Sequence, residues 1–350
     1  MDRRQLPPEQ IRTLRAAHPK MRERDFARIH AITEAELVSA YCGQGVLGLR
    51  PDVETLLAGL KQVGEVMALT RNESVVHEKI GIYEDVHFGQ KASMVLGENI
   101  DLRIFPERWA FGFAVERPSE TGELRRSLQF FDRFGDAVHK VHARPGTDLA
   151  AWHDLVGRLQ NLEQDGTLDI ETPSPEVPSG PAADREELRA RWESLTDTHQ
   201  FFPMLKALNL GRHEALNMVG ADYAWPLDAG AVAGLFAGAV AEALPVMVFV
   251  GNRGCIQIHS GPIVNVAPMG PWLNVMDETF HMHLRTDQIA EAWAVRKPTK
   301  DGHVTSVELY GADRELILQM FGKRHEGVDE RPDWRRLVEA LPPAGRSTAA

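Results

Sequence analysis

Residues 64–81 read GEVMALTRNESVVHEKIG, and residues 244–261 read LPVMVFVGNRGCIQIHSG. The two stretches share Val-Met at their third and fourth positions, Asn at the ninth and Gly at the last. They lie 180 positions apart, and the same offset carries Ala114-Val115 onto Ala294-Val295 without a gap. Because a match that persists at one offset marks a repeated structural unit, the sequence indicates an internal duplication that covers most of the chain.

Each copy has the same order of expected elements. In the first copy, residues from about 8 to 61 have helical periodicity, and Thr33 and Glu36 form a capping box. A helix from about 148 to 162 closes this copy. Between these helical regions lie strand-length runs rich in β-branched and aromatic residues, namely Val66–Leu69, Ser74–Tyr83, Ile100–Phe105, Ala110–Glu116, Arg126–Phe131 and Ala137–Ala143.

Proline-rich segments separate the copies and follow the second one. We expect an N-terminal half at 1–163, an exposed linker at 164–184, a C-terminal half at 185–341 and a disordered tail at 342–350. Strands follow one another without alternating helices, which favours antiparallel pairing. The expected fold class is therefore α+β, with two similar halves that each contain a large antiparallel β-sheet with flanking helices.

Composition narrows the function classes. The net charge of the 350 residues is −11, which opposes nonspecific binding to nucleic acid because phosphates require clustered Lys and Arg. The sequence shows neither about 18 consecutive apolar residues nor the apolar core of a signal peptide, so we expect a cytoplasmic protein and not a membrane protein. Cys42 and Cys255 lie far apart in the sequence, which argues against a disulfide framework, a CxxC zinc site and covalent haem attachment.

Histidine is the conspicuous chemical resource, with 14 residues, since the common nucleotide-binding and hydrolase motifs are missing. His199 stands in LTDTHQFFPML, where Pro203 disfavours a continuous helix. We expect a helix junction that aims the imidazole into the space between the domains. Phe201, Phe202, Met204 and Leu205 offer an apolar wall for a flat ring, and Asp197 is a candidate acceptor that orients the imidazole. Taken by themselves, these residues leave open a surface or core histidine, which is the more frequent case.

Five strings of the sequence carry a resemblance to a known family. They are MALTRNESVVHEKIG from residue 67, LTDTHQFF from 195, GCIQIHSGP from 254, MGPWLNV from 269 and DGHVTS from 301. Together they make the chain similar to the HemS/ChuS family of haem-degrading and haem-trafficking proteins. The resemblance implies two similar halves, with haem as the cofactor in a cleft between them.

The resemblance also implies roles for individual residues. His199 matches the axial iron ligand, and Arg103 matches a residue that approaches the opposite haem face, where it would take part in catalysis. In isolation, an Arg within a strand is more often an exposed charge. The repeat partner of Arg103 is His283, so the two copies have diverged at this position, as suits a single asymmetric site.

Haem carries two propionates that require cations or hydrogen-bond donors. By resemblance, the propionate side matches Arg212, Lys297, Gln319 and Arg324, although each of these basic residues alone is most often solvated. Some relatives use a histidine at the position of His77 for haem handling or a secondary site. In isolation, a histidine on a strand is more often a half-buried packing residue.

The leading hypothesis is a protein that accepts imported haem and either degrades it, with an external electron donor, or transfers it for iron acquisition. The main alternative is a non-enzymatic haem chaperone that delivers haem to a haem oxygenase. The haem ABC importer is a further candidate partner, and a homodimer is possible. A split-barrel flavin or nicotinamide reductase is a third hypothesis. The motifs do not separate an enzyme from a carrier.

Overall fold

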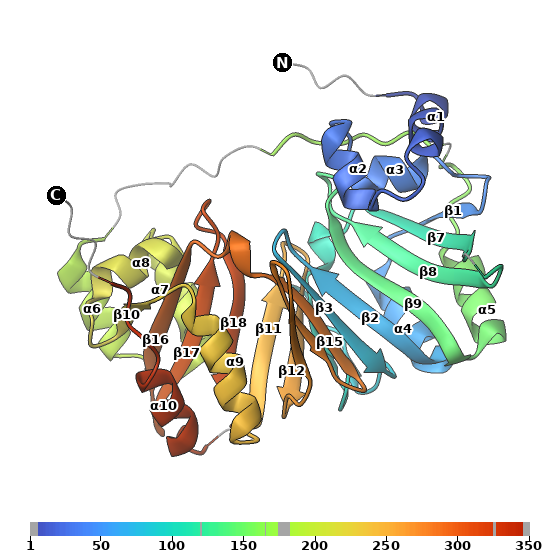
Figure 1. The fold of residues 1–350 in the computed structure, drawn as a ribbon. Coiled ribbons are helices and arrows are strands. Elements are labelled where there is room, and N and C mark those ends of the chain that lie inside the picture. Colours follow the sequence, from blue (N-terminus) through green and yellow to red (C-terminus); the bar gives the residue numbers. More distant parts are fainter. Residues whose placement is uncertain (1–5, 120, 165, 174–182, 325–326, 346–350) are drawn as a thin grey trace. The chain divides into compact units, whose positions relative to one another are not determined.

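The computed structural model describes residues 6–119, 121–164, 166–173, 183–324 and 327–345. It confirms the α+β fold class, with helices and antiparallel sheets in each of two compact units (Figure 1). The first unit comprises residues 1–71, 77–174 and 251–257, and the second comprises 72–76, 175–250 and 258–350. Among the described residues, no helix has the length and apolar character needed to cross a bilayer.

The first unit is built on an antiparallel sheet in the order β1-β7-β8-β9-β2, with a second group in the order β4-β5-β6. The helices and strand β3, of which residues 77–81 belong to the first unit, complete the chain order of this half. The bounds are α1 Pro8–Ala17, α2 Glu23–Ile29, α3 Glu34–Ser39, β1 Val46–Leu49, α4 Val53–Val63, β2 Gly64–Arg71, β3 Val75–Gly81, β4 Val86–His87, β5 Ser93–Leu96, β6 Asp101–Ile104, η1 Pro106–Arg108, β7 Phe111–Pro118, β8 Leu124–Phe131, β9 Ala137–Thr147 and α5 Leu149–Leu159.

Local sequence sets the limits of the helices that cover this sheet. Helix α4 begins where the Asp52 side chain accepts a hydrogen bond from the Thr55 N–H, and it ends at Gly64, whose φ of 79° suits glycine. Helix α5 begins at the N-cap Asp148 in the same way. Apolar side chains of both helices are buried with those of the strands, including Leu56 and Leu155. This packing places α4 and α5 on one face of the sheet.

The second unit repeats this plan, with the sheet order β10-β16-β17-β18-β11 and a second group β13-β14-β15. The bounds are α6 Arg185–Glu193, η2 Thr198–Gln200, α7 Phe201–Ala207, α8 Arg212–Val219, β10 Ala224–Leu227, α9 Ala231–Ala241, β11 Val246–Gly251, β12 Cys255–Gly261, β13 Val266–Met269, β14 Trp272–Met276, β15 Phe280–Arg285, η3 Thr286–Gln288, β16 Glu291–Thr299, β17 Gly302–Tyr310, β18 Leu316–Gly322 and α10 Pro332–Glu339.

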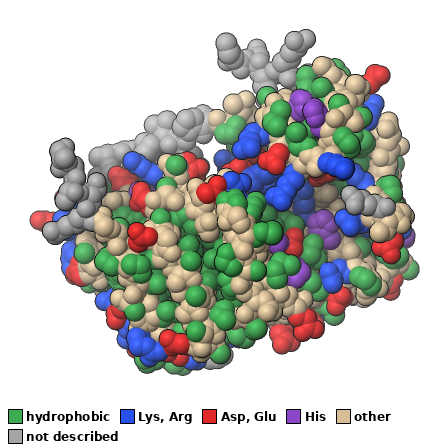
Figure 2. Space-filling view, in the orientation of Figure 1, with side chains coloured by type: hydrophobic (Ala, Val, Ile, Leu, Met, Phe, Trp, Pro, Cys, Tyr) green, Lys and Arg blue, Asp and Glu red, His purple; other side chains and the backbone are tan. Residues whose placement is uncertain are grey.

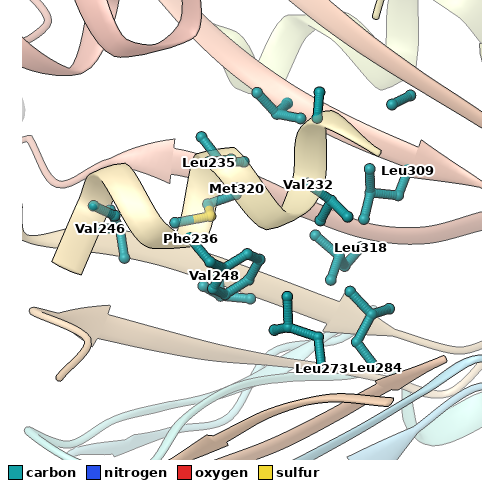
Figure 3. Close-up of a cluster of buried hydrophobic side chains, with 14 of the residues drawn as sticks. Val232, Leu235, Phe236, Val246, Val248, Leu273, Leu284, Leu309, Leu318 and Met320 are labelled. Carbon is teal, nitrogen blue, oxygen red and sulfur yellow. The ribbon is translucent and has the colours of Figure 1, made fainter. Parts of the chain in front are cut away.

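Two helical layers cover the two faces of the second unit's main sheet. On one face, α9 directs Val232, Leu235 and Phe236 toward the buried strand residues Val248 and Met320 (Figure 3). On the other face, α6, α7 and α8 form a separate apolar cluster with strand residues of β16 and β17. The second face is the one that positions the candidate site.

Each unit contains one short segment taken from the other half of the sequence. In the first unit, the Asn252 side chain donates from Nδ2 to the carbonyl oxygens of Arg71, at 2.9 Å, and Val138, at 2.8 Å. In the second unit, Asn72 donates from Nδ2 to the Ile317 carbonyl at 2.7 Å. The two asparagines occupy equivalent repeat positions, so the duplicated halves exchange equivalent segments.

Backbone bonds follow the same reciprocal pattern. The Gly254 carbonyl accepts from the Phe105 N–H at 3.0 Å within the first unit, and the Ser74 carbonyl accepts from the Arg285 N–H at 2.8 Å within the second. Both pairs are related by the repeat offset of 180 positions. The exchange therefore belongs to the repeated architecture itself.

The structure confirms some expected elements and corrects others. The Thr33 and Glu36 capping box is present at the start of α3. The expectation of helix throughout 8–61 is wrong at β1, where Val46 pairs with Val115 at the edge of the sheet and the side chains of Val46 and Leu49 are buried. Strands β4 and β5 are additions that the sequence patterns did not predict. The expected haem cleft between the halves stays a prediction.

The proline-rich segments are only partly described. Of the expected exposed linker, residues 174–182 lie outside the described residues, but Leu168 is buried in an apolar cluster of the first unit. Of the expected disordered tail, residues 346–350 also lie outside the described residues. The preceding part is ordered against β10, since the Asp228 N–H donates to the Pro342 carbonyl and the Ala344 N–H to the Pro226 carbonyl.

Candidate functional site

His199 lies at the junction between η2 and α7, and its side chain is 92% exposed. Its Nδ1 atom is 2.7 Å from Oδ1 of Asp197, and the same oxygen accepts from the His199 backbone N–H at 2.8 Å. When Nδ1 carries the proton, the lone pair of the neutral imidazole is on Nε2. The Asp197 carboxylate thus accepts from Nδ1 and leaves Nε2 free to act as a ligand.

Side-chain hydrogen bonds hold this junction together. The Gln200 Oε1 atom accepts from the backbone N–H of Thr196 at 2.9 Å and of Asp197 at 3.2 Å. Pro203 lies in the first turn of α7, where its missing N–H costs no helical hydrogen bond. The pKa of Asp197 is lowered, first by the hydrogen bond from the His199 N–H and then by the His199 side chain. The carboxylate thus stays ionised beside the imidazole.

Arg324 adds a positive charge to the same region. It is half-buried just after β18, and its charge contributes to the lowered pKa of Asp197. This electrostatic link places Arg324 in the surroundings of the His199 junction.

Three other predicted residues converge on a carboxylate that the sequence reasoning missed. Arg212 donates to Glu308 from Nε, at 2.8 Å, and from Nη2, at 2.6 Å. Lys297 Nζ donates to Glu308 Oε1 at 3.1 Å, and Gln319 Nε2 donates to the same oxygen at 3.0 Å. We name this group the Glu308 cluster, and it consists of Glu308, Arg212, Lys297, Gln319, Ser306 and Tyr310, whose hydroxyls also donate to the carboxylate.

Burial and charge act against each other in this cluster. Burial by itself would raise the pKa of Glu308, but the charges of Arg212 and Lys297 outweigh it and hold that pKa well below its ordinary value. Burial lowers the pKa of Lys297 to about 8, although Glu308 opposes the shift. For Arg212, the Glu308 charge outweighs burial and the pKa of the guanidinium is raised. At neutral pH the ion pairs are formed.

Phe201 connects the cluster to the histidine. The Arg212 guanidinium carbon lies 5.1 Å from the centre of the Phe201 ring, and Lys297 Nζ lies 4.6 Å from it. Phe201 is buried at the start of α7, two residues after His199. The next residue, Phe202, is 69% exposed. Phe201 therefore packs on the cations. Met204 and Leu205 are also buried, so Phe202 is the exposed member of the expected apolar wall.

Arg103 belongs to the first unit and is held by its own strand. On β6 it lies opposite Met94 of β5 and forms an ion pair with Asp101. Its Nη1 atom also donates to the Leu102 carbonyl at 3.1 Å. Burial raises the pKa of Asp101 despite the attraction of Arg103. Asp101 is thus a local partner that the sequence reasoning did not consider.

His77 is fully buried on β3 of the first unit. A side chain without accessible surface cannot contact an added ligand unless the local structure rearranges. The placement favours the packing alternative, and we do not include His77 in the proposed site. Of the predicted residues, the structure places His199, Arg212, Lys297, Gln319 and Arg324 in the second unit.

Both halves of the chain match one known protein family. The model described as "Haemin-degrading HemS.ChuX domain" matches residues 31–159 and again residues 209–341. The chain belongs to the HemS/ChuX family. The double match confirms the internal duplication, and it includes every predicted site residue except His199, which lies between the two matched segments.

Two curated relatives of the HemS/ChuX family are similar over nearly their full length. Hemin transport protein HmuS of Yersinia pestis is 40% identical over 328 residues, which cover 93% of this chain and 94% of the relative. Hemin transport protein HemS of Yersinia enterocolitica is 42% identical over 334 residues, which cover 95% and 96%.

Solved structures of HemS/ChuX-type proteins are equally similar. Holo-PhuS, a heme-binding protein from Pseudomonas aeruginosa, matches with a TM-score of 0.92 and 42% identity, over 97% of this chain and 100% of that chain. The heme degrading enzyme ChuS of Escherichia coli O157:H7 matches with a TM-score of 0.88 and 39% identity, over 95% and 97%.

Proposed function

We propose that this HemS/ChuX-family protein binds haem as its cargo, with Nε2 of His199 as the axial iron ligand. The observation that carries the proposal is the exposed His199 imidazole, which Asp197 orients through Nδ1. Relatives of similar length named for hemin transport, heme binding and heme degradation support haem as the ligand.

The second unit offers side chains suited to the iron, the flat ring and the propionates of a haem molecule. A neutral imidazole nitrogen is a strong ligand for haem iron. Phe202 provides an exposed aromatic surface beside it. Arg212, whose side chain is 19% exposed, and Arg324 provide guanidinium groups, whose planar geometry suits carboxylates. These residues fit a flat apolar ligand that carries propionates at one edge.

Two fates of the bound haem fit the family. Transport and degradation both occur among the names of the relatives, so we propose that the protein accepts haem and either degrades it or passes it on for iron acquisition. For degradation, we propose Arg103 as a polar donor near the haem and an external reductant as the source of electrons. We place this function in the cytoplasm, with the haem ABC importer or a haem oxygenase as candidate partners.

The first test is the iron ligand. We expect wild-type protein to show a saturable Soret shift near one equivalent of haemin, and His199→Ala to weaken binding and alter the ligand-dependent bands, because the iron loses its imidazole. The control is His153→Ala, an exposed histidine of α5 that pairs weakly with Glu116. Wild-type spectra and dissociation rates in His199→Ala would disprove the ligand assignment.

The second test separates an enzyme from a carrier. Haem-loaded protein is mixed with a reductant under air, with catalase present, and the visible spectrum is followed. Loss of the Soret band together with an identified tetrapyrrole product indicates degradation. A stable spectrum, combined with fast transfer of haem to an apo-globin, indicates the chaperone.

A further inference from the structure

Glu308 is fully buried, and its carboxylate accepts six hydrogen bonds from side chains. Three of the donor residues are those expected to contact haem propionates, namely Arg212, Lys297 and Gln319. The protein therefore already satisfies these donors with a carboxylate of its own. A haem propionate has the same chemical group, so it meets donors that an internal carboxylate occupies.

The duplicated unit shows that the fold does not need this carboxylate. On β8 of the first unit, Gln129 lies opposite Phe113 and Lys140, just as Glu308 on β17 lies opposite Trp293 and Gln319. Gln129 is also buried, and its Nε2 donates to Ser127 Oγ at 3.0 Å. The equivalent position of the first unit thus accepts a neutral glutamine. Strand pairing by itself does not require a carboxylate at residue 308.

The carboxylate near the two positions comes from different elements. At the first unit's position, Glu34 pairs with Arg71 and lies 3.8 Å from Lys140 Nζ. Figure 2 shows Lys and Arg side chains gathered over the first unit's strands near α2 and α3. In the second unit, Arg212 at the start of α8 takes the place of Glu34 at the start of α3. Both units thus pair one carboxylate with two cations, but in the second unit the carboxylate is Glu308 on the strand itself and is fully buried.

The charges of Arg212, Lys297 and Glu308 determine how the cluster attracts an anionic ligand. Arg212 and Lys297 contribute two positive charges, and Glu308 contributes one negative charge, so these three described residues present one net positive charge. Lys297 is only 4% exposed, whereas Arg212 is 19% exposed. An incoming carboxylate meets Arg212, two of whose donor nitrogens are already bound to Glu308.

We propose that Glu308 limits the affinity of the site for haem carboxylates, because it competes with them for Arg212 and Gln319 and offsets the charge of the covered Lys297. This inference rests on the proposed function and deepens it, since a weakened carboxylate subsite suits a protein that must release its ligand. Glu308 acts through its neighbours and does not itself touch haem.

The experiment compares haemin with haemin dimethyl ester, whose two carboxylates are blocked, on wild type and Glu308→Gln. The variant raises the net charge of the three residues from one to two. We expect about tenfold tighter binding of haemin and slower release to an apo-globin, with unchanged binding of the ester. Arg212→Gln in the Glu308→Gln background should abolish the gain.

The matched control is Glu242→Gln, which removes a negative charge from α9, where Glu242 pairs with Arg336. This variant should bind both ligands like wild type. Equal loss of both ligands in Glu308→Gln would overturn the proposal, because it would make Glu308 a structural residue. Weaker binding of haemin with unchanged ester binding would also overturn it, since Glu308 would then assist the carboxylate contact. Failure of wild type to bind haemin at all would instead remove the proposed function.

Discussion

Lys297 is a cation that we expected to contact haem, but the folded protein covers its side chain. Its ammonium group bonds to Glu308, faces the Phe201 ring and has almost no exposed surface. The family resemblance made Lys297 a candidate propionate contact, but a sequence does not show that another side chain of the protein already occupies its ammonium group. Lys297 therefore acts on a ligand through the charge of the cluster.

The lowered pKa of Lys297 makes that charge dependent on pH. The charged groups that face Lys297 are Glu308 and Arg212, while the neighbouring Tyr310 has a raised pKa and stays neutral. Because Lys297 loses its proton near pH 8, the net charge falls from one toward zero as the pH rises from 7 to 9. We expect the preference for haemin over its dimethyl ester to decrease several-fold over this range.

Lys297→Met is the variant that checks this effect, since it removes the titrating group and keeps an apolar side chain of similar length. Its preference for haemin over the ester should be low at pH 7 and flat up to pH 9. A wild-type preference that does not change with pH would show that Lys297 carries no part of the carboxylate affinity.

Among single residues, Glu308 was the largest omission. The string SVELY contains a glutamate between apolar neighbours on a strand, a pattern that indicates a buried carboxylate with partners. The sequence does not show that Glu308 accepts hydrogen bonds from Arg212, because the two residues are 96 positions apart. Asp197 was found because it lies two positions from His199, within the reach of a local hydrogen bond.

At the scale of elements, the exchanged segments are the least expected feature. Asn252 holds residues 251–257 in the first unit through two backbone carbonyls, and its Oδ1 atom accepts from the N–H groups of Gly254 and Cys255. The repeat analysis identified Asn72 and Asn252 as equivalent. Their function as anchors depends on chain segments that are remote in sequence, which periodicity does not reveal.

We expect Asn252→Ala to lower the free energy of unfolding by about 3 kcal/mol, because two buried carbonyls lose their donor and the tight turn loses its acceptor. Chemical denaturation measures this change. Asn161→Ala is the comparison, since Asn161 accepts one exposed local bond from the Glu163 N–H, and it should cost below about 1 kcal/mol. Similar losses for both variants would contradict the anchoring role of Asn252.

At the scale of the whole molecule, neither unit is a continuous piece of chain. The first unit includes residues 251–257, whose Gly254 carbonyl accepts from the Trp109 indole at 2.9 Å and whose Cys255 is buried in the main apolar cluster. A chain cut after the first copy lacks this segment. It therefore exposes backbone groups and apolar surface that the full-length chain covers.

A protein of residues 1–174 should consequently not remain a stable monomer. We expect sedimentation to show a dimer or larger species, and thermal unfolding to occur at least about 10 °C below that of the full chain. Mixing with residues 175–350 supplies the missing segment and should restore the stability. A monomeric fragment with the full chain's melting temperature would show that residues 251–257 are dispensable.

The sequence by itself determined the duplication, the α+β class and the family, because these depend on patterns that recur at a constant offset or in short local motifs. It also placed His199 beside its orienting Asp197. Only the tertiary structure decided that His77 is buried and that three expected propionate contacts bind Glu308. Burial and ion pairing depend on which distant side chains the folded sheet brings together, and this information is not present in the spacing of residues along the chain.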